Sequence, residues 1–399
     1  MKNSVPRKII HLDLDAFFCA VEELKDPALA GKAFAVGGKA GQRGVISSCS
    51  YPARKKGVHS AMPTGQAFRL CPDLILISSN FGDYHTKSQE VMEILHQWSG
   101  LVEQISVDEA FIDVSDLPQG VEEIAQSLQQ QVLEKTDLPC SIGAAGNKLV
   151  AKIATDTGKS ASKSDNYPRS ILCVPPGKEA EFLAPLPVKA MWGVGPKMAA
   201  SLADMGMRTI GDIANSPLEL MERRFGKYGA DLHRHAQGID DRPVTVEYEA
   251  KSISQEVTFA NDTTDLNFLR STLRDLSAKV GYRMRCDGVC ARVIRIKLRW
   301  SDFTTLTRQV ALSAPTDQDG VIYATAESLL KKVWLTDRPV RLIGVGGSNL
   351  IEQVHQLSLF DTQTEKERRL LGALDELREK FGKGAVQRAD HLQKKNTKG

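Results

Sequence analysis

Alternating apolar and polar positions at the start of the chain predict a β-strand that leads into a helix. Apolar residues from Ile10 to Leu14 alternate with polar ones, which is the two-residue period of a strand. Apolar residues then recur three and four positions apart from Phe17 to Leu24, the spacing of an amphipathic helix. Aspartate is a favoured cap of helix N-termini, so we expect Asp15 to cap this helix.

The same two periods predict the elements of the next 145 residues. Strands and helices alternate, and residues 102–115 are predicted as a hairpin with carboxylates at its tip. Proline is favoured in a first helical turn, so a helix is expected to begin at Tyr51, followed by Pro52. The other predicted strands are 32–38, 45–50 and 140–145, and the other predicted helices are 84–98, 121–135 and 147–159.

The second half of the chain shows two further patterns. Short helices separated by glycine turns predict a small all-α unit over 188–225, and the polar, turn-rich segment 238–244 is typical of a linker. The remaining order of strand, helix, two strands, helix and strand is typical of a four-stranded sheet backed by two helices. These elements are strand 251–259, helix 265–283, strands 289–300 and 304–312, helix 319–334 and strand 339–348, followed by a charged helix around Leu374.

Length and composition exclude several classes of protein. A chain of 399 residues is long enough for two to three domains, and 42% hydrophobic residues exclude disorder over the whole length. No apolar run approaches the ~18 residues of a membrane span, and carboxylates stand where a signal peptide needs an apolar core. We therefore expect a cytoplasmic protein without membrane association.

The cysteines give no sign of a disulfide framework or a zinc module. Seven cysteines are scattered along the chain, and none forms a C-x-x-C pair. We expect them to be small buried side chains. The eight histidines give one close pair, His233 and His235, without further residues at ligand spacing, so any metal ion is expected to be held by oxygen ligands.

The net charge of +3, which is 52 basic minus 49 acidic residues, hides two blocks of opposite sign. Residues 101–150 carry 2 Lys or Arg against 9 Asp or Glu, whereas residues 279–299 carry seven Lys or Arg against Asp287 alone. An acidic and a basic block indicate two sites with different partners.

Three carboxylates in apolar, strand-like surroundings form the strongest candidate site: Asp13, Asp108 and Glu109. Burying charged carboxylates is costly unless cations compensate, and oxygen-only ligands favour Mg²⁺ or Mn²⁺. Two such ions about 3.5–4 Å apart would stabilise the attacking and leaving oxygens of a phosphoryl or nucleotidyl transfer. Each residue alone is explained as well by a turn or a cap, but the three together favour a metal site.

Two groups of residues at helical spacing suit the binding of a triphosphate. In the first, a guanidinium lies beside a phenol near a helix N-terminus. In the second, three lysines share one helical face and are expected to line the same pocket. A solvated basic surface explains each group equally well. The groups are Tyr51, Arg54 and Lys55, and Lys148, Lys152 and Lys159.

A row of cations on one face of strand 289–300 suits contact with a nucleic-acid backbone. The cations stand about 6.6 Å apart, close to the spacing of successive phosphates, and the next strand offers hydroxyl and amide groups on its matching face. An exposed sheet face kept soluble is the alternative, although three cations in line without carboxylate partners are less usual. The residues are Arg295, Lys297 and Arg299, and Thr305, Thr307 and Gln309.

The segment GVGPK between two predicted helices is a weaker phosphate-binding candidate. Gly193 and Gly195 would let backbone N–H groups approach a phosphate, with Lys197 beside them. A single G-x-G has little specificity by itself.

These motifs together resemble those of the Y-family translesion DNA polymerases, and most closely the bacterial DNA polymerase IV group. The resemblance follows the chain in order and covers nearly all of it. It runs through HLDLDAFFCAVE, RGVISSCSYPARKKGV, SVDEAFIDVS, NKLVAKIA, the helix-hairpin-helix stretch MWGVGPK, KSISQEVTF and the clamp-binding pentapeptide QLSLF.

The resemblance implies a role for each of these groups. The three carboxylates and the backbone carbonyl of Leu14 would bind two catalytic Mg²⁺ ions, or Mn²⁺ in their place. Phe18 would be the steric gate against a ribose 2′-OH, and Ser47 would form part of the roof over the templating base. The triphosphate would be held by Ser48, Tyr51, Arg54 and Lys159, and a sliding clamp would bind Gln356, Leu357, Leu359 and Phe360.

The resemblance also implies a right-hand polymerase of the α+β multidomain class with a helix-hairpin-helix thumb and a βαββαβ little finger. The implied parts are a palm from 1–15 and 80–166, small fingers from 16–79, a helical thumb from 167–238, a linker from 239–247, a little finger from 248–350 and a tail from 351–399.

The implied activity is template-directed DNA synthesis from dNTPs by two-metal nucleotidyl transfer, of low fidelity and without proofreading. The implied partners are primer–template DNA, dNTP and a sliding clamp, bound by a monomer. The alternatives are a non-catalytic scaffold that binds damaged DNA and the clamp, a nucleotidyl cyclase and a metal-dependent nuclease.

Overall fold

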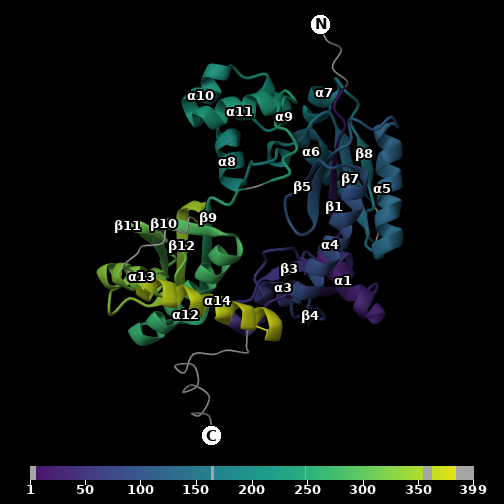
Figure 1. Cartoon of the computed structure of the whole chain (residues 1–399). Helices are drawn as coiled ribbons and strands as arrows, with labels where there is room; N and C mark the ends of the chain where they lie inside the picture. The colour runs from purple at the N-terminus through teal and green to yellow at the C-terminus, as the bar shows by residue number, and fades with distance from the viewer. Residues whose placement is uncertain (1–5, 163–165, 248, 354–361, 383–399) are drawn as a thin grey trace. The chain divides into compact units, whose positions relative to one another are not determined.

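The computed structural model describes residues 6–162, 166–247, 249–353 and 362–382 (Figure 1). The chain divides into two compact units, Met1–Tyr248 and Glu249–Gly399. Among the helices in these described ranges, none has both the length and the apolar character that crossing a membrane requires.

A five-stranded sheet in the order β5-β6-β1-β7-β8 forms the centre of the first unit. β1 lies in the middle, antiparallel to both β6 and β7, and β8 runs parallel to β7. The predicted first strand, the hairpin and strand 140–145 are all present. The strands are β1 Ile9–Leu14, β5 Val102–Gln104, β6 Glu109–Asp113, β7 Cys140–Ala145 and β8 Ile171–Cys173.

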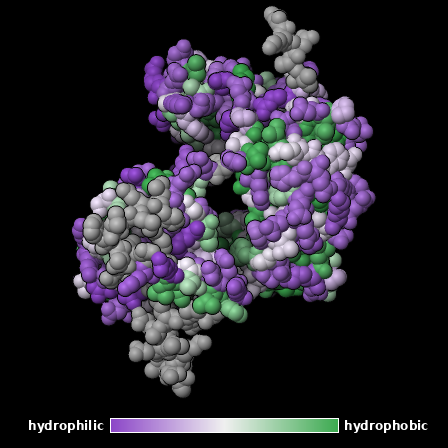
Figure 2. Space-filling model, viewed as in Figure 1, coloured by the Kyte–Doolittle hydropathy of each residue, from purple (hydrophilic) through white to green (hydrophobic). Residues whose placement is uncertain are grey.

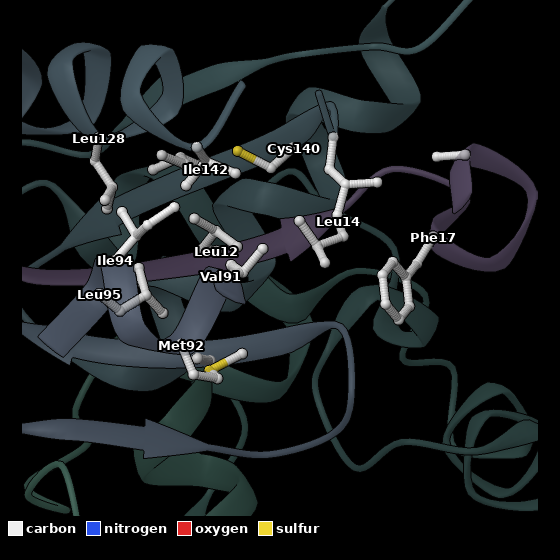
Figure 3. Packing of buried hydrophobic residues seen from close by; sticks show 14 of the residues in the cluster. Leu12, Leu14, Phe17, Val91, Met92, Ile94, Leu95, Leu128, Cys140 and Ile142 are labelled. Atoms are coloured by element: carbon white, nitrogen blue, oxygen red, sulfur yellow. The ribbon is translucent and has the colours of Figure 1, made fainter. Parts of the chain in front are cut away.

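The alternation of side chains in β1 determines which face of this sheet carries the candidate catalytic residue Asp13. Leu12 and Leu14 pack into the core with side chains of α4 and α5, as Figure 3 shows. Successive strand residues point to opposite faces, so Asp13 points to the other face, which α6 covers. The outward side of α5 is largely hydrophilic (Figure 2), as expected of an amphipathic helix. The helices are α4 Phe81–Trp98, α5 Val121–Thr136 and α6 Lys148–Ala161.

Helix α6 lies very close to β7 at Gly143. A Cβ atom at this position would stand 2.1 Å from the carbonyl oxygen of Ala151 and 2.4 Å from the backbone nitrogen of Thr155. Only a residue without a side chain permits this approach. Gly143 therefore sets the distance between α6 and the sheet.

A second, three-stranded sheet in the order β3-β2-β4 follows β1 in the sequence. α2 begins at Tyr51 as predicted, with Pro52 in its first turn and the Ser50 side chain as its cap. The elements of this part are α1 Phe17–Lys25, β2 Phe34–Gly37, β3 Ile46–Cys49, α2 Tyr51–Lys55, α3 Thr64–Leu70 and β4 Ile75–Ile77.

Short helices complete the first unit, as the glycine turns predicted. Their apolar sides share one buried cluster with α6 and with Ile9 and Phe111 of the central sheet. The helices are α7 Glu179–Leu183, α8 Pro196–Asp204, α9 Ile210–Ala214, α10 Leu218–Phe225 and α11 Lys227–Ala236.

Asp240 ties the segment after α11 to the beginning of α6. The Leu149 N–H donates to Asp240 Oδ2 at 3.1 Å, and Arg242 donates to both carboxylate oxygens, at 2.7 and 2.9 Å. Burial by itself would raise the pKa of Asp240, but the hydrogen bonds from Arg242 hold this pKa below its ordinary value. The charged carboxylate therefore stabilises the folded first unit.

We expect Asp240→Asn to lower the free energy of unfolding by about 2 kcal/mol, because the substitution removes a charge-assisted pair at a buried group. The folded pKa is lowered, so this contribution is present above the unfolded pKa of about 3.9 and is lost as the pH falls below it. Urea unfolding of both proteins at pH 7 and below pH 4 measures the difference. Asp241→Asn is the matched control, because Asp241 pairs with Arg234 at an exposed site. An equal loss in both variants, or a loss that does not depend on pH, would contradict this role.

The second unit has the βαββαβ order that the sequence predicts. Its antiparallel sheet has the order β11-β10-β12-β9, and α12 and α13 pack their apolar sides on one face of it. The elements are β9 Ser252–Thr263, α12 Leu266–Cys286, β10 Val289–Trp300, β11 Thr305–Thr316, α13 Asp319–Val333 and β12 Val340–Glu352.

A last helix, α14 Thr362–Phe381, belongs to the second unit and contains the predicted charged helix. Arg285 of α12 donates to Asp375 of α14 at 2.6 Å, and Leu371 is buried. The pentapeptide predicted to bind a clamp, residues 356–360, lies outside the described residues.

The expectation that all cysteines are buried is wrong for Cys286. This residue is exposed because it is the last residue of α12, where the helix ends at the surface. Cys173 and Cys290 are partly buried, and the other four are buried as predicted: Cys19, Cys49, Cys71 and Cys140.

Candidate active site

The end of β1 borders a cavity of about 320 Å³ lined by most of the predicted catalytic and nucleotide-binding residues. These residues come from β1, α1, β3, α2, the hairpin and α6, so the fold assembles them from distant parts of the sequence. They are Asp13, Leu14, Phe18, Ser47, Ser48, Arg54, Asp108, Glu109 and Lys159.

Strand pairing places the predicted carboxylates next to one another. Asp13 lies directly opposite Glu109 in the antiparallel register of β1 and β6. The Leu14 N–H donates to the carbonyl oxygen of Asp108 at 2.9 Å, which brings the tip of the hairpin to the end of β1. Directly opposite residues have Cβ atoms about 4.5–5.5 Å apart, so the negative charges are concentrated in a small space.

Each of these carboxylates is paired with a group of the chain. Within the described residues, no three His, Cys, Asp or Glu side chains converge as the ligands of one metal ion would. The carboxylates turn instead towards two ammonium groups and a hydroxyl. The pairs are Lys159 Nζ with Asp13 Oδ1 at 2.6 Å, Lys152 Nζ with Glu109 Oε1 at 3.0 Å, and Ser106 Oγ with Asp108 Oδ1 at 2.5 Å.

The electrostatics of the cavity favour a further cation. Burial raises the pKa of Glu109, and the neighbouring charges of Asp13 and Asp108 raise it further, against the effect of Lys152. Like charges held together in partly buried surroundings are stabilised by positive charge. The oxygen donors of this cavity therefore have the chemistry that a hard divalent cation prefers.

Asp156 is a fourth carboxylate of the cavity, and the sequence analysis missed it. It lies on α6 and lines the cavity. Burial raises its pKa, and Lys152 opposes this rise. The signal was available in the sequence, since Asp156 stands four residues after Lys152 and three before Lys159, on the same helical face.

The prediction that Asp15 caps α1 is wrong. The N-cap is Ala16, which has left-handed backbone angles and makes no side-chain cap. The buried Asp15 carboxylate instead accepts hydrogen bonds from Ser141 Oγ at 2.9 Å and from the Arg169 N–H at 3.0 Å, and lies 3.1 Å from Lys159 Nζ. Donors from distant parts of the chain satisfy Asp15, so it is turned away from the helix.

Phe18 lines the cavity, and an aromatic side chain from α4 supports it. The rings of Phe18 and Tyr84 are stacked, with centroids 4.2 Å apart and planes 14° apart. Tyr84 is buried, and its hydroxyl donates to Glu22 Oε1 at 2.7 Å. Phe17 is in the core, as the helical period predicted. The position of Phe18 is therefore fixed from behind by Tyr84, which the sequence analysis did not identify.

Arg54 lines the cavity, and Tyr51, which is not among the lining residues, lies beside it. The Arg54 guanidinium stands 4.8 Å from the centroid of the Tyr51 ring. The edge of the Tyr167 ring contacts Tyr51 at 5.6 Å between centroids, and the Tyr167 hydroxyl donates to Glu23 at 2.8 Å. The basic face proposed here is smaller than predicted, because Lys55 does not line the cavity.

The expectation that three lysines of α6 line one pocket is wrong for Lys148 and Lys152, because only Lys159 lines the cavity. Lys159 lines the cavity and Lys152 bonds to Glu109, but Lys148 is buried and pairs with Glu103 at 2.7 Å. Lys148 is the first residue of α6, where the helix lies beside β5, so the same helical face meets a different strand there.

Arg295 and Lys297 line a second cavity of about 320 Å³, over the sheet of the second unit. Gly344 and Gly346 of β12 line it too, which leaves open space between β10 and β9. The expectation that the cations lack carboxylate partners is wrong for Lys297. Glu256 of β9 stands across Gly344 from it, and the two charged groups are 2.7 Å apart.

The other polar residues of this sheet face are placed as follows. Arg299 Nε donates to Thr305 Oγ1 at 2.9 Å. Thr307 lines the second cavity, and Gln309 is exposed on β11. The predicted row of polar groups is therefore present on one face, with one carboxylate within it.

The GVGPK segment forms a turn before α8 in which Val194 is buried and the other residues are exposed. Gly193 has φ +92°, a conformation that favours glycine, and its carbonyl accepts a hydrogen bond from Tyr228 at 2.9 Å. Gly195 is the N-cap of α8, and Lys197 is exposed in its first turn. The backbone N–H groups at this helix start are placed where an anion is stabilised.

Comparisons with known proteins match most of the chain. The profile of the impB/mucB/samB family matches residues 12–156, and the profile of the C-terminal domain of that family matches residues 250–359. The profile described as the thumb domain of DNA polymerase-iota matches residues 189–240.

Curated relatives and solved structures agree with these matches. A protein of Desulfatibacillum aliphaticivorans named DNA polymerase IV is 41% identical over 388 residues, which cover 96% of each chain. One of Halalkalibacterium halodurans named DNA polymerase IV 1 is 36% identical over 395 residues, 97% of this chain and 94% of that one. A solved Y-family DNA polymerase chimera is 27% identical, with a TM-score of 0.77, and the match covers 86% of this chain and 99% of that one. An insertion ternary complex of Dbh DNA polymerase has the same identity and coverage, with a TM-score of 0.61.

Proposed function

The chain belongs to the impB/mucB/samB family as a Y-family DNA polymerase of the DNA polymerase IV group, and from this premise we propose that the cavity at the end of β1 is its nucleotidyl-transfer site. As a DNA-directed DNA polymerase it carries out translesion DNA synthesis on primer–template DNA with incoming nucleotides. The observation that carries the proposal is that one cavity joins Asp13, Asp108 and Glu109 to Phe18 and Arg54.

The enzyme uses divalent metal ions, as the family does, and we propose two Mg²⁺ ions, or Mn²⁺, held by the three carboxylates and the Leu14 carbonyl. The donors fit such ions by chemistry, because all are oxygens and their negative charges are crowded. Bound there, the ions would stabilise charge on the attacking and leaving oxygens of the transfer.

The other residues of the cavity would bind and select the nucleotide. Arg54, beside Tyr51, offers a planar fork of N–H donors that matches phosphate oxygens, and Ser48 and Lys159 add donors from β3 and α6. Phe18 would exclude a 2′-OH, because Tyr84 behind it leaves the ring no room to yield. Ser47, an exposed small residue of β3, would leave space for the templating base.

We propose that the chain has the domains of a right-hand polymerase. The palm would be 1–15 and 80–166, the fingers 16–79, the thumb 167–238 and the little finger 248–350. We further propose that the enzyme works as a cytoplasmic monomer, is of low fidelity and lacks proofreading, and that residues 356–360 bind a sliding clamp. GVGPK and the row from Arg295 to Arg299 would contact the DNA backbone.

Replacing Arg295, Lys297 and Arg299 together by Gln is expected to weaken primer–template binding for every sequence alike. Each lost phosphate contact removes about 0.9 from the slope of log affinity against log salt, so the slope should flatten by about 2 to 3. Fluorescence anisotropy with two unrelated duplexes over a salt series measures both effects. The matched control replaces Lys279, Lys331 and Lys332 on the two helices of the opposite face. A sequence-selective loss, or an equal loss in the control, would contradict backbone contact by this row.

Template-dependent primer extension tests the proposed function directly. The purified chain is expected to extend a primer with the complementary dNTP in the presence of Mg²⁺, including past a damaged template base. Conversion of the nucleotide to a cyclic product, or cleavage of the primer in place of extension, would support the cyclase or the nuclease alternative, which the comparisons do not favour.

A further inference from the structure

One face of α6 carries a row of charged residues, of which the proposed nucleotidyl-transfer site gives a role only to Lys159. Lys152, Asp156 and Lys159 stand at i, i+4 and i+7, so they form a single row along the helix, next to the carboxylates of β1 and β6. The two lysine side chains are only 13% and 20% exposed. Their charges are therefore directed at the site and not at solvent.

Each lysine of this row contacts two carboxylates, one of which is a proposed metal ligand. Lys152 Nζ is 3.0 Å from Glu109 Oε1 and 3.9 Å from Asp156 Oδ2. Lys159 Nζ is 2.6 Å from Asp13 Oδ1 and 3.1 Å from Asp15 Oδ1. The nearer partner is in both cases the proposed ligand, and the second partner is a carboxylate to which the proposed site gives no role.

A divalent ion and an ammonium group cannot share the same carboxylate oxygen without strong repulsion. An ammonium that leaves its carboxylate in partly buried surroundings loses stabilisation unless another negative group is within reach. The lysine stem is long and flexible, so its ammonium can move a few ångströms without any backbone change. Asp156 and Asp15 are the negative groups within reach.

We propose that Lys152 and Lys159 compete with divalent cations for Glu109 and Asp13, and that Asp156 and Asp15 receive the two lysines when cations bind. This inference rests on the proposed assignment of the metal ligands. It assigns to the row on α6 the role of positioning residues, which hold the two ligand carboxylates in place and set the concentration of metal at which the site fills.

The Lys152–Asp156 pair provides the test, because Lys159 is also proposed to contact the triphosphate and Asp15 is fully buried. Mn²⁺ binding to the full chain without DNA is measured by electron paramagnetic resonance, and the sites of interest are those that Asp108→Ala removes. Lys152→Gln is expected to bind Mn²⁺ at these sites about three- to tenfold more tightly, because the competing charge is gone. Lys56→Gln is the control for the loss of one positive charge, since Lys56 pairs with Asp73 at an exposed site. Its affinity should equal that of the unsubstituted chain.

A double-substitution cycle separates positioning from direct ligation. Asp156→Asn is expected to weaken Mn²⁺ binding about threefold when Lys152 is present, because the displaced lysine then has no second partner. The same substitution should have no effect in the Lys152→Gln background. An equal loss in both backgrounds makes Asp156 a metal ligand and overturns the proposal. Unchanged or weaker binding by Lys152→Gln overturns it as well.

The experiments distinguish failure of the proposed lysine–metal competition from failure of the proposed nucleotidyl-transfer site. Primer extension that depends on Asp108 with unchanged Mn²⁺ affinity in Lys152→Gln rejects the competition and keeps the polymerase site. Absence of extension by the unsubstituted chain rejects the site. Thermal unfolding of each variant shows whether an altered affinity reflects a folded protein.

Discussion

Asp108→Ala is expected to reduce template-dependent primer extension by about a thousandfold or more. The substitution removes a proposed metal ligand, and the charge stabilisation that such an ion supplies in phosphoryl transfer amounts to several kcal/mol. The pairing of β6 with β1 is made by backbone groups, so the fold around the site is expected to persist. Single-nucleotide incorporation under single-turnover conditions measures the loss.

Asp113→Ala is the matched control for this substitution. Asp113 lies at the other end of β6, where its carboxylate accepts a hydrogen bond from the Ser115 N–H at 3.0 Å, and it does not line the cavity. The incorporation rate of Asp113→Ala should stay within a few-fold of the rate of the unsubstituted enzyme. Comparable extension rates for Asp108→Ala and the unsubstituted chain would remove the proposed site, whereas absence of extension by both would favour a non-catalytic scaffold.

Phe18→Ala is expected to lower the preference for dNTPs over rNTPs by about a hundredfold. The ring of Phe18 stacks on Tyr84 at 4.2 Å, so it presents a rigid wall, and its removal opens space for a 2′-OH. Steric exclusion of a small group by a packed side chain is worth about this factor. The ratio of kcat/KM for a matched dNTP and rNTP pair, in each protein, measures the change.

Phe81→Ala is the control that separates the effect of the cavity wall from a general effect of the aromatic cluster. Phe81 contacts the rings of Phe18 and Tyr84 edge-on, but it is exposed and does not line the cavity. The preference of Phe81→Ala for dNTPs over rNTPs should remain close to that of the unsubstituted enzyme. An unchanged preference in Phe18→Ala would show that another group excludes the ribose.

Local periodicity predicted the elements and the side of β1 that carries Asp13. Alternation over five residues is enough to separate Leu12 and Leu14, which enter the core, from Asp13, which faces α6. The family resemblance supplied the residues that the cavity brings together, including Phe18 and Arg54. These features depend on short stretches of sequence, so they can be predicted before the fold is known.

Contacts between distant segments could not be predicted in the same way. Asp15 has the type and position of a helix cap, but Ser141 and Arg169, more than a hundred residues away, provide its hydrogen bonds. Tyr84 supports Phe18 from a helix more than sixty residues further along. A helical face predicts which residues share a direction, but the neighbour that each one meets depends on where the helix crosses the sheet.

Gly143 does not line the cavity, yet the active site of this enzyme depends on it. The row of charges on α6 can reach the carboxylates of β1 and β6 only while the helix rests on β7, and the missing side chain at Gly143 leaves the room for this contact. In a survey of natural variants, a change at this position therefore belongs with changes in the cavity itself, although Gly143 carries no functional group. Sequence drift at this site is limited by distance and not by chemistry.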